Sequence, residues 1–307
     1  MKVCLVRCPS PFLIDERAFP PLGLMSVGAG LRKQGHDVVL YDGDLSVLPL
    51  GYPYYGFGPT SPEYPYAVDA MQRIKDSNPT ARVILGGPHA TLNYGKCDDG
   101  WDCIVVGDGE VAAEQAFLTS DHLIFAPSDH LDSYPFADRT LVDLHSYHFT
   151  LQGRPATTLM GSRGCPHACG FCCKNHTRVR LRSAPSIIQE IQVLEKHGFR
   201  AIAFPEDIFI LNRTRTEMVA AYLKQQGIIW RCLVRADLVV KYGIGFLNML
   251  RDCGCVGVGI GIESGSDTIL KTIGKGETVA TMREAVTMLK YANIYTKGFF
   301  IVGLPGE

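Results

Sequence analysis

The sequence lacks several features that would direct a protein to a membrane or to nucleic acid. No apolar run approaches the ~20 residues that a membrane-spanning helix needs. The first residues, Met1 to Arg7, are too short for a signal peptide, and Pro9 and Pro11 soon follow them. The formal net charge of −1 gives no electrostatic reason to expect nucleic acid or an anionic membrane as a partner. These absences predict a cytoplasmic protein, and 307 residues suffice for two domains with separate cores.

Disulfide bonds are not expected either. The eleven cysteines are an odd number, and no secretion signal precedes them. Cytosolic cysteines are usually reduced, so a cluster of them indicates metal binding or catalysis. Five others lie in or beside apolar segments, where we expect them to act as small buried hydrophobic residues: Cys4, Cys8, Cys232, Cys253 and Cys255.

Three cysteines are gathered in a loop rich in glycine and proline. Cys165, Cys169 and Cys172 have the spacing C-x3-C-x2-C, whereas Cys173 is out of register and is interpreted as a bystander. Thiolates select zinc or iron–sulfur clusters among biological metals. No second C-x-x-C or H-x3-H pair follows to complete a structural zinc site. A 4Fe–4S cluster normally takes four cysteines, so three would leave one iron with an open position, as in a catalytic site.

The first ~130 residues alternate between short apolar runs and amphipathic stretches, which is typical of a mainly parallel α/β sheet. We expect helices at 22–34, 66–77 and 110–119. Leu24, Val27 and Leu31 give the first helix an apolar face, and Gly35 ends it. The expected strands are Val3–Val6, Asp37–Tyr41, Tyr54–Gly58, Arg82–Leu85 and Cys103–Val106.

A second series of βα units follows a proline-punctuated stretch. Strands are expected at 157–160, 201–204, 229–234, 256–262 and 295–302. Helices are expected at 184–196, with Ser183 as N-cap, and at 215–226, 245–253 and 279–292. This rhythm fits a barrel or partial barrel, in which chemistry lies in the loops after the strands. The cysteine loop follows the first of these strands.

The expected domains are therefore 1–126, a Rossmann-like parallel sheet, then a linker at 127–155, and a partial (β/α) barrel at 156–307.

The cysteine loop resembles the signature of radical S-adenosylmethionine (SAM) enzymes, including the aromatic Phe171 before the last cysteine. The resemblance implies that Cys165, Cys169 and Cys172 bind a 4Fe–4S cluster whose open iron chelates SAM. One electron from an external donor of the flavodoxin or ferredoxin type would then yield a 5′-deoxyadenosyl radical. In this family, residues at later strand ends contact SAM. The resemblance assigns that role to Glu206, Asp207, Arg235, Glu263, Ser264 and Gly303.

The first domain resembles the cobalamin-binding domain that precedes many radical SAM cores. Glycine at the expected strand ends lets a ligand approach the backbone closely. The Asp-x-His-x-x-Gly motif of the wider cobalamin family is absent, as it commonly is in radical SAM relatives. The resemblance implies cobalamin contacts from Leu22, Gly23, Thr60, Gly86, Gly87, His89, Gly107, Gly109 and Glu110.

The sequence thus predicts a cobalamin-dependent radical SAM enzyme, and methyl transfer to an unactivated centre as its reaction. A radical SAM cyclase or oxidoreductase, similar to magnesium-protoporphyrin monomethyl ester cyclase, stays open. A non-catalytic iron–sulfur or zinc module is the other alternative. The barrel holds about five of the six βα units that the resemblance implies, so we expect the chain to be a fragment or a truncated product. A small molecule or a peptide is the expected substrate.

Overall fold

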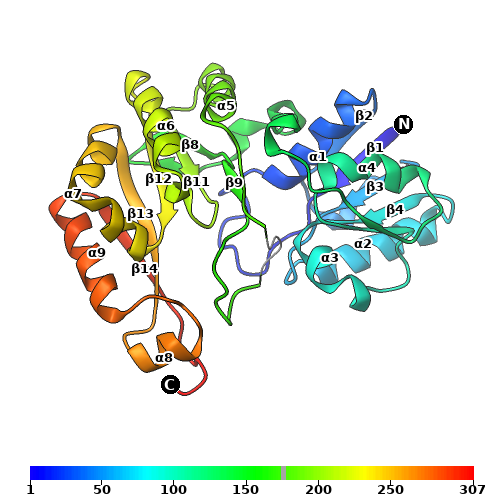
Figure 1. The fold of residues 1–307 in the computed structure, drawn as a ribbon. Helices are drawn as coiled ribbons and strands as arrows, with labels where there is room; N and C mark the ends of the chain where they lie inside the picture. The colour runs from blue at the N-terminus through cyan, green and yellow to red at the C-terminus, as the bar shows by residue number, and fades with distance from the viewer. Residues whose placement is uncertain (174–177) are drawn as a thin grey trace. The chain divides into compact units, whose positions relative to one another are not determined.

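The structure is a computed structural model of the chain, and it describes residues 1–173 and 178–307. The chain divides into two compact units, Met1–His148 and Phe149–Glu307 (Figure 1). Within the described residues, none of the helices combines the length and the apolar character that crossing a bilayer requires.

The first unit is built on a six-stranded sheet in which all paired strands run parallel. The order β2-β1-β3-β4-β5-β6 confirms the expected α/β class for this half. Parallel strands end at the same edge of a sheet, so the loops after β1, β3, β4 and β5 share one edge. The strands are β1 (Lys2–Val6), β2 (Asp37–Tyr41), β3 (Tyr54–Phe57), β4 (Arg82–Leu85), β5 (Cys103–Val106) and β6 (Leu123–Phe125).

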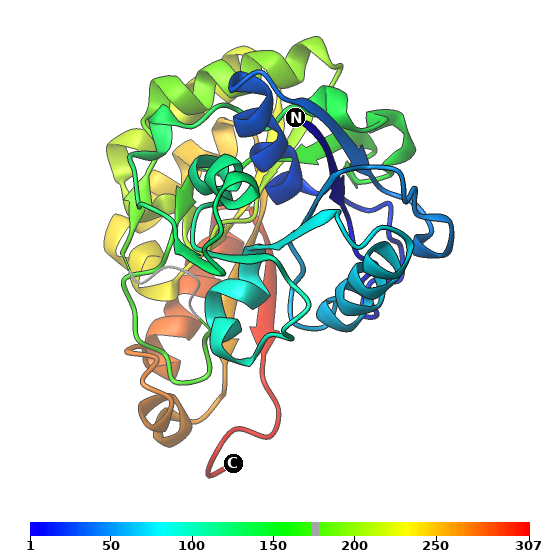
Figure 2. The same ribbon diagram turned by 90° about the vertical axis from the view of Figure 1, so that its right-hand side faces the viewer.

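Helices cover both faces of this sheet. The period-2 alternation of β1 sends Val3 and Leu5 into one apolar core, and Cys4 and Val6 into another. The first core lies under α1 (Leu22–Lys33) and α4 (Gly109–Leu118). The second lies under α2 (Tyr64–Ser77) and α3 (Gly87–Asn93). Figure 2 shows α1 in dark blue and α2 in light blue on opposite sides of the sheet.

The segment 127–148, within the expected linker, belongs to the first unit by its packing. Ala137 and Leu141 lie in the core under α1. Single 3-10 turns lie in the connections of both units. Five are in the first unit and one, η6, is in the second: η1 (Leu45–Val47), η2 (Tyr94–Lys96), η3 (Leu131–Ser133), η4 (Arg139–Leu141), η5 (Leu144–Ser146) and η6 (Phe209–Leu211).

The second unit is a six-stranded sheet with the order β14-β13-β12-β11-β8-β7. All its pairs are parallel except the short antiparallel pair β7–β8. Consecutive parallel strands are neighbours, so right-handed crossovers place the helices on one face (Figure 1). The strands are β7 (Thr150–Leu151), β8 (Arg154–Thr158), β11 (Ala201–Phe204), β12 (Ile229–Val234), β13 (Cys255–Glu263) and β14 (Tyr295–Phe300).

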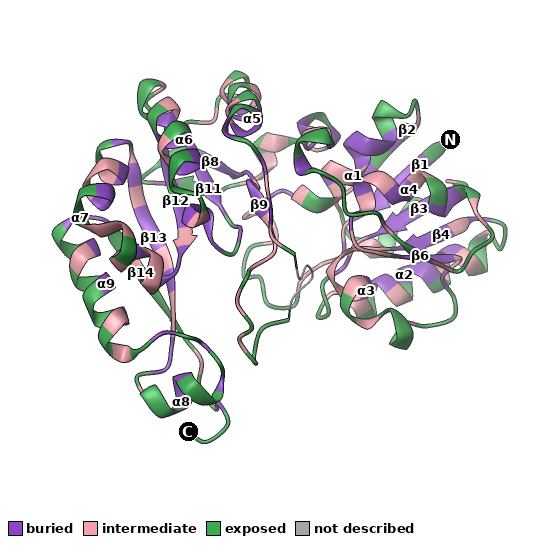
Figure 3. Cartoon of the chain, viewed as in Figure 1, coloured by how far each residue is buried: buried purple, intermediate pink, exposed green. Residues whose placement is uncertain are grey.

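The helices of this unit bury one stripe each against the sheet. Their outward residues are exposed, whereas the strands of the sheet interior are buried (Figure 3). The helices are α5 (Ala184–Lys196), α6 (Arg213–Gln225), α7 (Ala236–Asp252), α8 (Asp267–Thr272) and α9 (Val279–Tyr291). The Ser183 hydroxyl accepts the Ser186 N–H at 3.3 Å, which confirms the expected N-cap of α5.

Three expectations about elements were incomplete. The helix expected at 245–253 begins at Ala236, because Gly243, with a φ of 78°, joins two helical pieces across a kink. A further helix that was not expected, α3, follows β4 directly. The elements β6 and α8 were not expected at all, since each is only a few residues long.

Candidate functional site

The cysteine loop is tied at its ends and near its middle. Ser162–Arg163 (β9) pairs antiparallel with Arg180–Leu181 (β10), which closes the two ends of the loop. Near the middle, the Gly170 N–H donates to the Ile273 carbonyl at 2.7 Å. Gly164, with a φ of 85°, supplies the left-handed turn before the first cysteine. The loop therefore leaves the carboxyl end of β8 and is fixed to the segment that follows α8.

The three cysteines differ in exposure. Cys165 and Cys169 are partly buried, and Cys165 packs against the core of the second unit. Cys172 and its neighbour Cys173 are exposed, and Phe171 is partly exposed beside them. None of the cysteines of the described chain is in a disulfide.

Across residues 1–173 and 178–307, no three His, Cys, Asp or Glu side chains are close enough together to hold a single metal ion. A structural zinc site takes four protein ligands around one centre, whereas the loop supplies three thiols in register. A 4Fe–4S cluster places each thiolate on a different iron and so accepts ligands that stand farther apart. The donor set of three thiols on one partly open loop fits the cluster better than the single ion.

Glu206 follows β11 and points at the start of the cysteine loop. A Cβ built on Gly161 would lie 2.7 Å from its Oε1 atom, so only glycine leaves room there. Both carboxylate oxygens are fully buried, and neither accepts a hydrogen bond of good geometry from the described residues. Burial raises the pKa of Glu206 to about 7, against the opposing effects of the Arg215 guanidinium and of the nearby backbone N–H groups of Gly161 and Glu206. A buried carboxylate whose oxygens make no hydrogen bond of good geometry can still accept from a cationic ligand.

Two arginines hold the backbone behind this carboxylate. The Arg215 guanidinium donates to the carbonyl oxygens of Gly161 and Phe209, each at 2.7 Å, and lies 4.0 Å from Glu206. The Arg182 N–H also donates to the Gly161 carbonyl, at 2.9 Å, and its side chain pairs with Glu190. The position of Gly161, and with it the entry to the cysteine loop, is therefore fixed from two sides.

A buried cluster of charges lies at the ends of β12 and β13. Arg235 is 3.4 Å from Glu277, and Lys275 is 3.0 Å from Glu263 and 3.6 Å from Glu277. Burial raises the pKa of the Glu277 carboxyl. The Asp237 N–H, in the first turn of α7, donates to Glu277 at 2.8 Å. Two cations therefore face two buried carboxylates, and Arg235 also pairs with the more exposed Asp237 at 3.3 Å.

The residues expected to contact SAM thus stand at one edge of one sheet. Glu206 follows β11, Arg235 follows β12, and Glu263 ends β13. Asp207 is exposed, Ser264 is buried, and Gly303 takes a φ of 83° after β14. Lys275 and Glu277 were not expected. The sequence pattern that could have revealed them is Gly274-Lys-Gly276-Glu. Its two glycines have positive φ, and the two charged side chains between and after them are buried.

In the first unit, the loops at the carboxyl edge interlock through backbone contacts. Gly87, with a φ of 79°, leaves no room for a side chain, because a Cβ there would lie 2.8 Å from Gly58. The His89 N–H donates to Pro59, and the Thr91 hydroxyl accepts the Gly107 N–H at 3.1 Å. Three loops, after β3, β4 and β5, therefore form one rim of closely packed backbone.

The remaining residues expected on this rim have different environments. His89 lies in α3, stacks on Tyr64 with ring centroids 3.9 Å apart, and bonds to Ser61 at 3.0 Å. Burial lowers the pKa of its imidazole. These contacts fix the orientation of the His89 ring in the rim. Leu22 and Gly23 open α1, Thr60 and Gly86 lie at the β3 and β4 ends, and Gly109 and the buried Glu110 open α4. No described atom lies within 4 Å of a Cβ built on Gly23.

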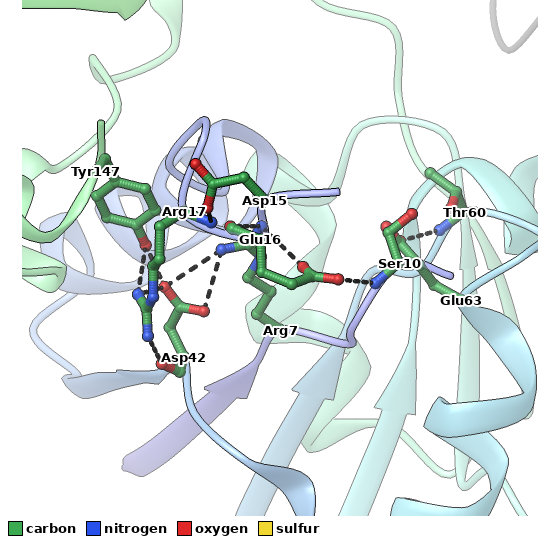
Figure 4. A network of polar contacts seen from close by, with 9 residues as sticks. All are labelled: Arg7, Ser10, Asp15, Glu16, Arg17, Asp42, Thr60, Glu63 and Tyr147. Atoms are coloured by element: carbon green, nitrogen blue, oxygen red, sulfur yellow. Dashed lines mark hydrogen bonds and ion pairs between the residues drawn. The ribbon is translucent and has the colours of Figure 1, made fainter. Parts of the chain in front are cut away.

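A polar network closes the other end of this edge (Figure 4). Asp42, directly after β2, pairs with Arg7 at 3.2 Å and with Arg17 at 2.5 Å, and accepts the Tyr147 hydroxyl. Arg7 also pairs with Glu16 at 3.3 Å. A cavity of about 280 Å³ lies against these side chains. The network ties the segment after β1 to the sheet.

The chain is similar to several known proteins. Residues 159–307 match the model of the Radical SAM superfamily. An uncharacterized methyltransferase of Pyrococcus horikoshii is 28% identical over all of this chain and 75% of its own length. An anaerobic magnesium-protoporphyrin IX monomethyl ester cyclase of Synechocystis is 25% identical over 96% of this chain and 67% of its own.

The fold is also that of a solved structure. OxsB, a cobalamin-dependent SAM radical enzyme with aqua-cobalamin bound, superposes with a TM-score of 0.80 at 19% identity. The superposition covers 98% of this chain and 49% of OxsB, so the chain spans about half of that protein. The expected fold, a Rossmann-like parallel sheet followed by a partial radical SAM barrel, is confirmed.

Proposed function

Because residues 159–307 match the Radical SAM superfamily, we propose that the chain is an enzyme that binds a 4Fe–4S cluster and SAM and transfers a methyl group with the help of cobalamin. The observation that carries this proposal is the loop of three thiols at the carboxyl edge of the second sheet, beside an unsatisfied buried carboxylate. When bound, the reduced cluster supplies the electron that cleaves SAM to methionine and a 5′-deoxyadenosyl radical.

The chain's own residues would bind and orient these groups. We assign Cys165, Cys169 and Cys172 to the cluster, and Glu206 to the ammonium of SAM, since its oxygens are buried without donors. Arg235 would meet the SAM carboxylate and Glu263 the ribose. Phe171, Asp207, Ser264 and Gly303 would complete the pocket. An external protein of the flavodoxin or ferredoxin type would deliver the electron.

Cobalamin would bind at the rim of the first unit. Gly58, Gly87 and Gly107 have no side chains, so a large flat ligand could approach the backbone of the rim closely. The open space beside Gly23 suits such a ligand as well. Cobalamin supplies a methyl carrier when bound. Methyl transfer is favoured because the relative that aligns with the whole chain is named a methyltransferase. The substrate, a small molecule or a peptide, is not specified by these sites.

A second candidate reaction is ring closure. The Synechocystis relative, named a cyclase, aligns with nearly all of this chain, and the same cysteine loop would serve either reaction. The two candidates share the radical-generating half and differ in the fate of the SAM methyl group.

The test is anaerobic reconstitution with iron and sulfide, followed by reduction with SAM labelled in its methyl group. We expect 5′-deoxyadenosine from the wild type and none from C169A, and cobalt-bound label when cobalamin is supplied. A fully loaded wild-type protein that releases no 5′-deoxyadenosine would overturn the proposal. Release of 5′-deoxyadenosine with no label on cobalamin would favour the cyclase.

A further inference from the structure

Lys275 lies at the centre of the buried charge cluster, although it follows α8 and not a strand. Its side chain is 6% exposed, and its ammonium contacts Glu263 at 3.0 Å and Glu277 at 3.6 Å. Its backbone is also used: the Lys275 carbonyl accepts the Arg235 guanidinium at 3.1 Å. One residue therefore touches two of the strand-end residues to which we assign SAM contacts, Glu263 and Arg235.

Glu263 is held in an unusual conformation. Its φ of 61° is in the left-handed region, which costs a non-glycine residue about 1 kcal/mol or more. The pairing register with β14 also shifts between Gly261 and Glu263. As a result the Glu263 carboxylate folds back over Gly261, and a Cβ on Gly261 would lie 2.8 Å from the Lys275 ammonium.

The two oxygens of this carboxylate have different environments. Oε1 accepts the Lys275 ammonium. Oε2 has no hydrogen-bond partner within the described parts of the chain, yet it is not among their fully buried unsatisfied atoms. A carboxylate that is clamped through one oxygen presents the other in a fixed direction, and ribose hydroxyls are suitable donors to it.

The lysine is itself fixed on both sides. Glu277 bridges Lys275 and Arg235, and its other oxygen accepts the Asp237 N–H of α7. On the opposite side, the Lys275 N–H donates to Leu270 of α8 at 3.0 Å. In the same turn, the Ile273 carbonyl accepts a hydrogen bond from the Gly170 N–H of the cysteine loop. The segment 273–277 thus joins the cysteine loop to the charge cluster.

We propose that Lys275 is a positioning residue for SAM: it holds Oε1 of Glu263, so that Oε2 faces the ribose. This inference rests on the proposed function, because it needs SAM at the β13 end. A lysine that served stability alone would pair with Glu263 in the same way, but its loss would not change SAM affinity in a chain that still folds and still holds iron.

The experiment compares reconstituted wild type with K275M, K275Q and the control K271M, which alters an exposed lysine of the neighbouring helix α8. SAM is titrated against each reduced protein, and binding is followed by the change in the electron paramagnetic resonance spectrum of the cluster. Iron content and circular dichroism are measured on the same samples. We expect the Kd for SAM to rise about tenfold or more in K275M, since a charged hydrogen bond is lost, with iron content unchanged. K271M should bind as the wild type does.

K275Q keeps a donor for Glu263 but removes the charge, so its Kd should lie between those of wild type and K275M. It carries the test if K275M does not fold. A wild-type Kd in a folded, iron-loaded K275M or K275Q would overturn the inference and leave the proposed function intact. A wild type that holds iron but shows no spectral change with SAM would overturn the proposed function, and this inference with it.

Discussion

Gly161 and Glu206 are in direct contact at the point where the cysteine loop leaves the second sheet. A Cβ on Gly161 would lie 2.7 Å from Oε1 of Glu206 and 3.1 Å from Ile187. The glycine is therefore required by the carboxylate and not by its own backbone angles. This contact links the position of the loop to the position of a proposed SAM ligand.

The substitution G161A should push Glu206 out of place and lower the free energy of unfolding by about 1–3 kcal/mol, the usual cost of an extra methyl in a packed interior. Urea denaturation of the apo protein measures this. The control is G245A, an exposed helical glycine without neighbours, which should be neutral or slightly stabilising. The double variant G161A/E206A should recover part of the loss, and strictly additive effects would contradict the contact.

The titration of Glu206 should appear in the pH dependence of stability. Its folded pKa of about 7 exceeds the ordinary value of 4.5, chiefly through burial. The folded state thus holds the proton more tightly, so this contribution is fully present below pH about 4.5 and is lost as the pH rises through about 7.

We therefore expect E206Q to gain stability over wild type between pH 5 and pH 8, by up to about 3 kcal/mol at about 1.4 kcal/mol per pKa unit. Urea unfolding of both proteins at several pH values gives the difference. E284Q, at an exposed position, is the control and should show no such trend. A constant difference between E206Q and wild type across this range would refute the raised pKa.

In the first unit, α1 and α4 are in close contact at Gly30. A Cβ there would lie 2.5 Å from the Glu110 carbonyl oxygen, and a backbone atom cannot rotate away. G30A should lower the free energy of unfolding by about 2 kcal/mol or more. G23A, near the start of the same helix with no neighbour within 4 Å in the described chain, should not. Equal stabilities of G30A and G23A would show that the helices can separate freely.

Asp42 should be important for the order of the segment after β1, because it pairs with Arg7, Arg17 and Tyr147. D42A leaves the mostly buried Arg7 without its nearest counter-ion, and should cost about 1–3 kcal/mol. Hydrogen exchange of residues 9–20 should accelerate. E217A breaks an exposed i,i+4 pair with Arg213 and should change stability by less than about 0.5 kcal/mol. Unchanged exchange in D42A would mean that other contacts hold the segment.

Much of the fold could be predicted from the sequence, because each long element has a clear period and a clear end. The strand Ala201–Phe204 was placed residue for residue, as was the N-cap Ser183. Elements of a few residues, such as β6, carry too short a pattern. The part of α7 before Gly243 was also not predicted, because the glycine in the sequence suggested that a helix begins after it.

The site was only partly predictable, for a physical reason. Residues at strand ends, such as Glu206 and Arg235, can be found because the strands can be found. Lys275 and Glu277 lie after a short helix, and they reach the cluster only through the turns at Gly274 and Gly276. The spacing of residues in the sequence does not show that these turns bring Lys275 and Glu277 back to the strand ends.

The central claim is that three thiols, and not the fourth beside them, hold a 4Fe–4S cluster. Iron and sulfide per chain, measured after anaerobic reconstitution of C165A, C169A, C172A and C173A, test it most directly. The account predicts that each of the first three variants loses the cluster, whereas C173A keeps iron and sulfide at the wild-type ratio. Loss of iron in C173A alone, or full iron in any of the other three, would contradict it.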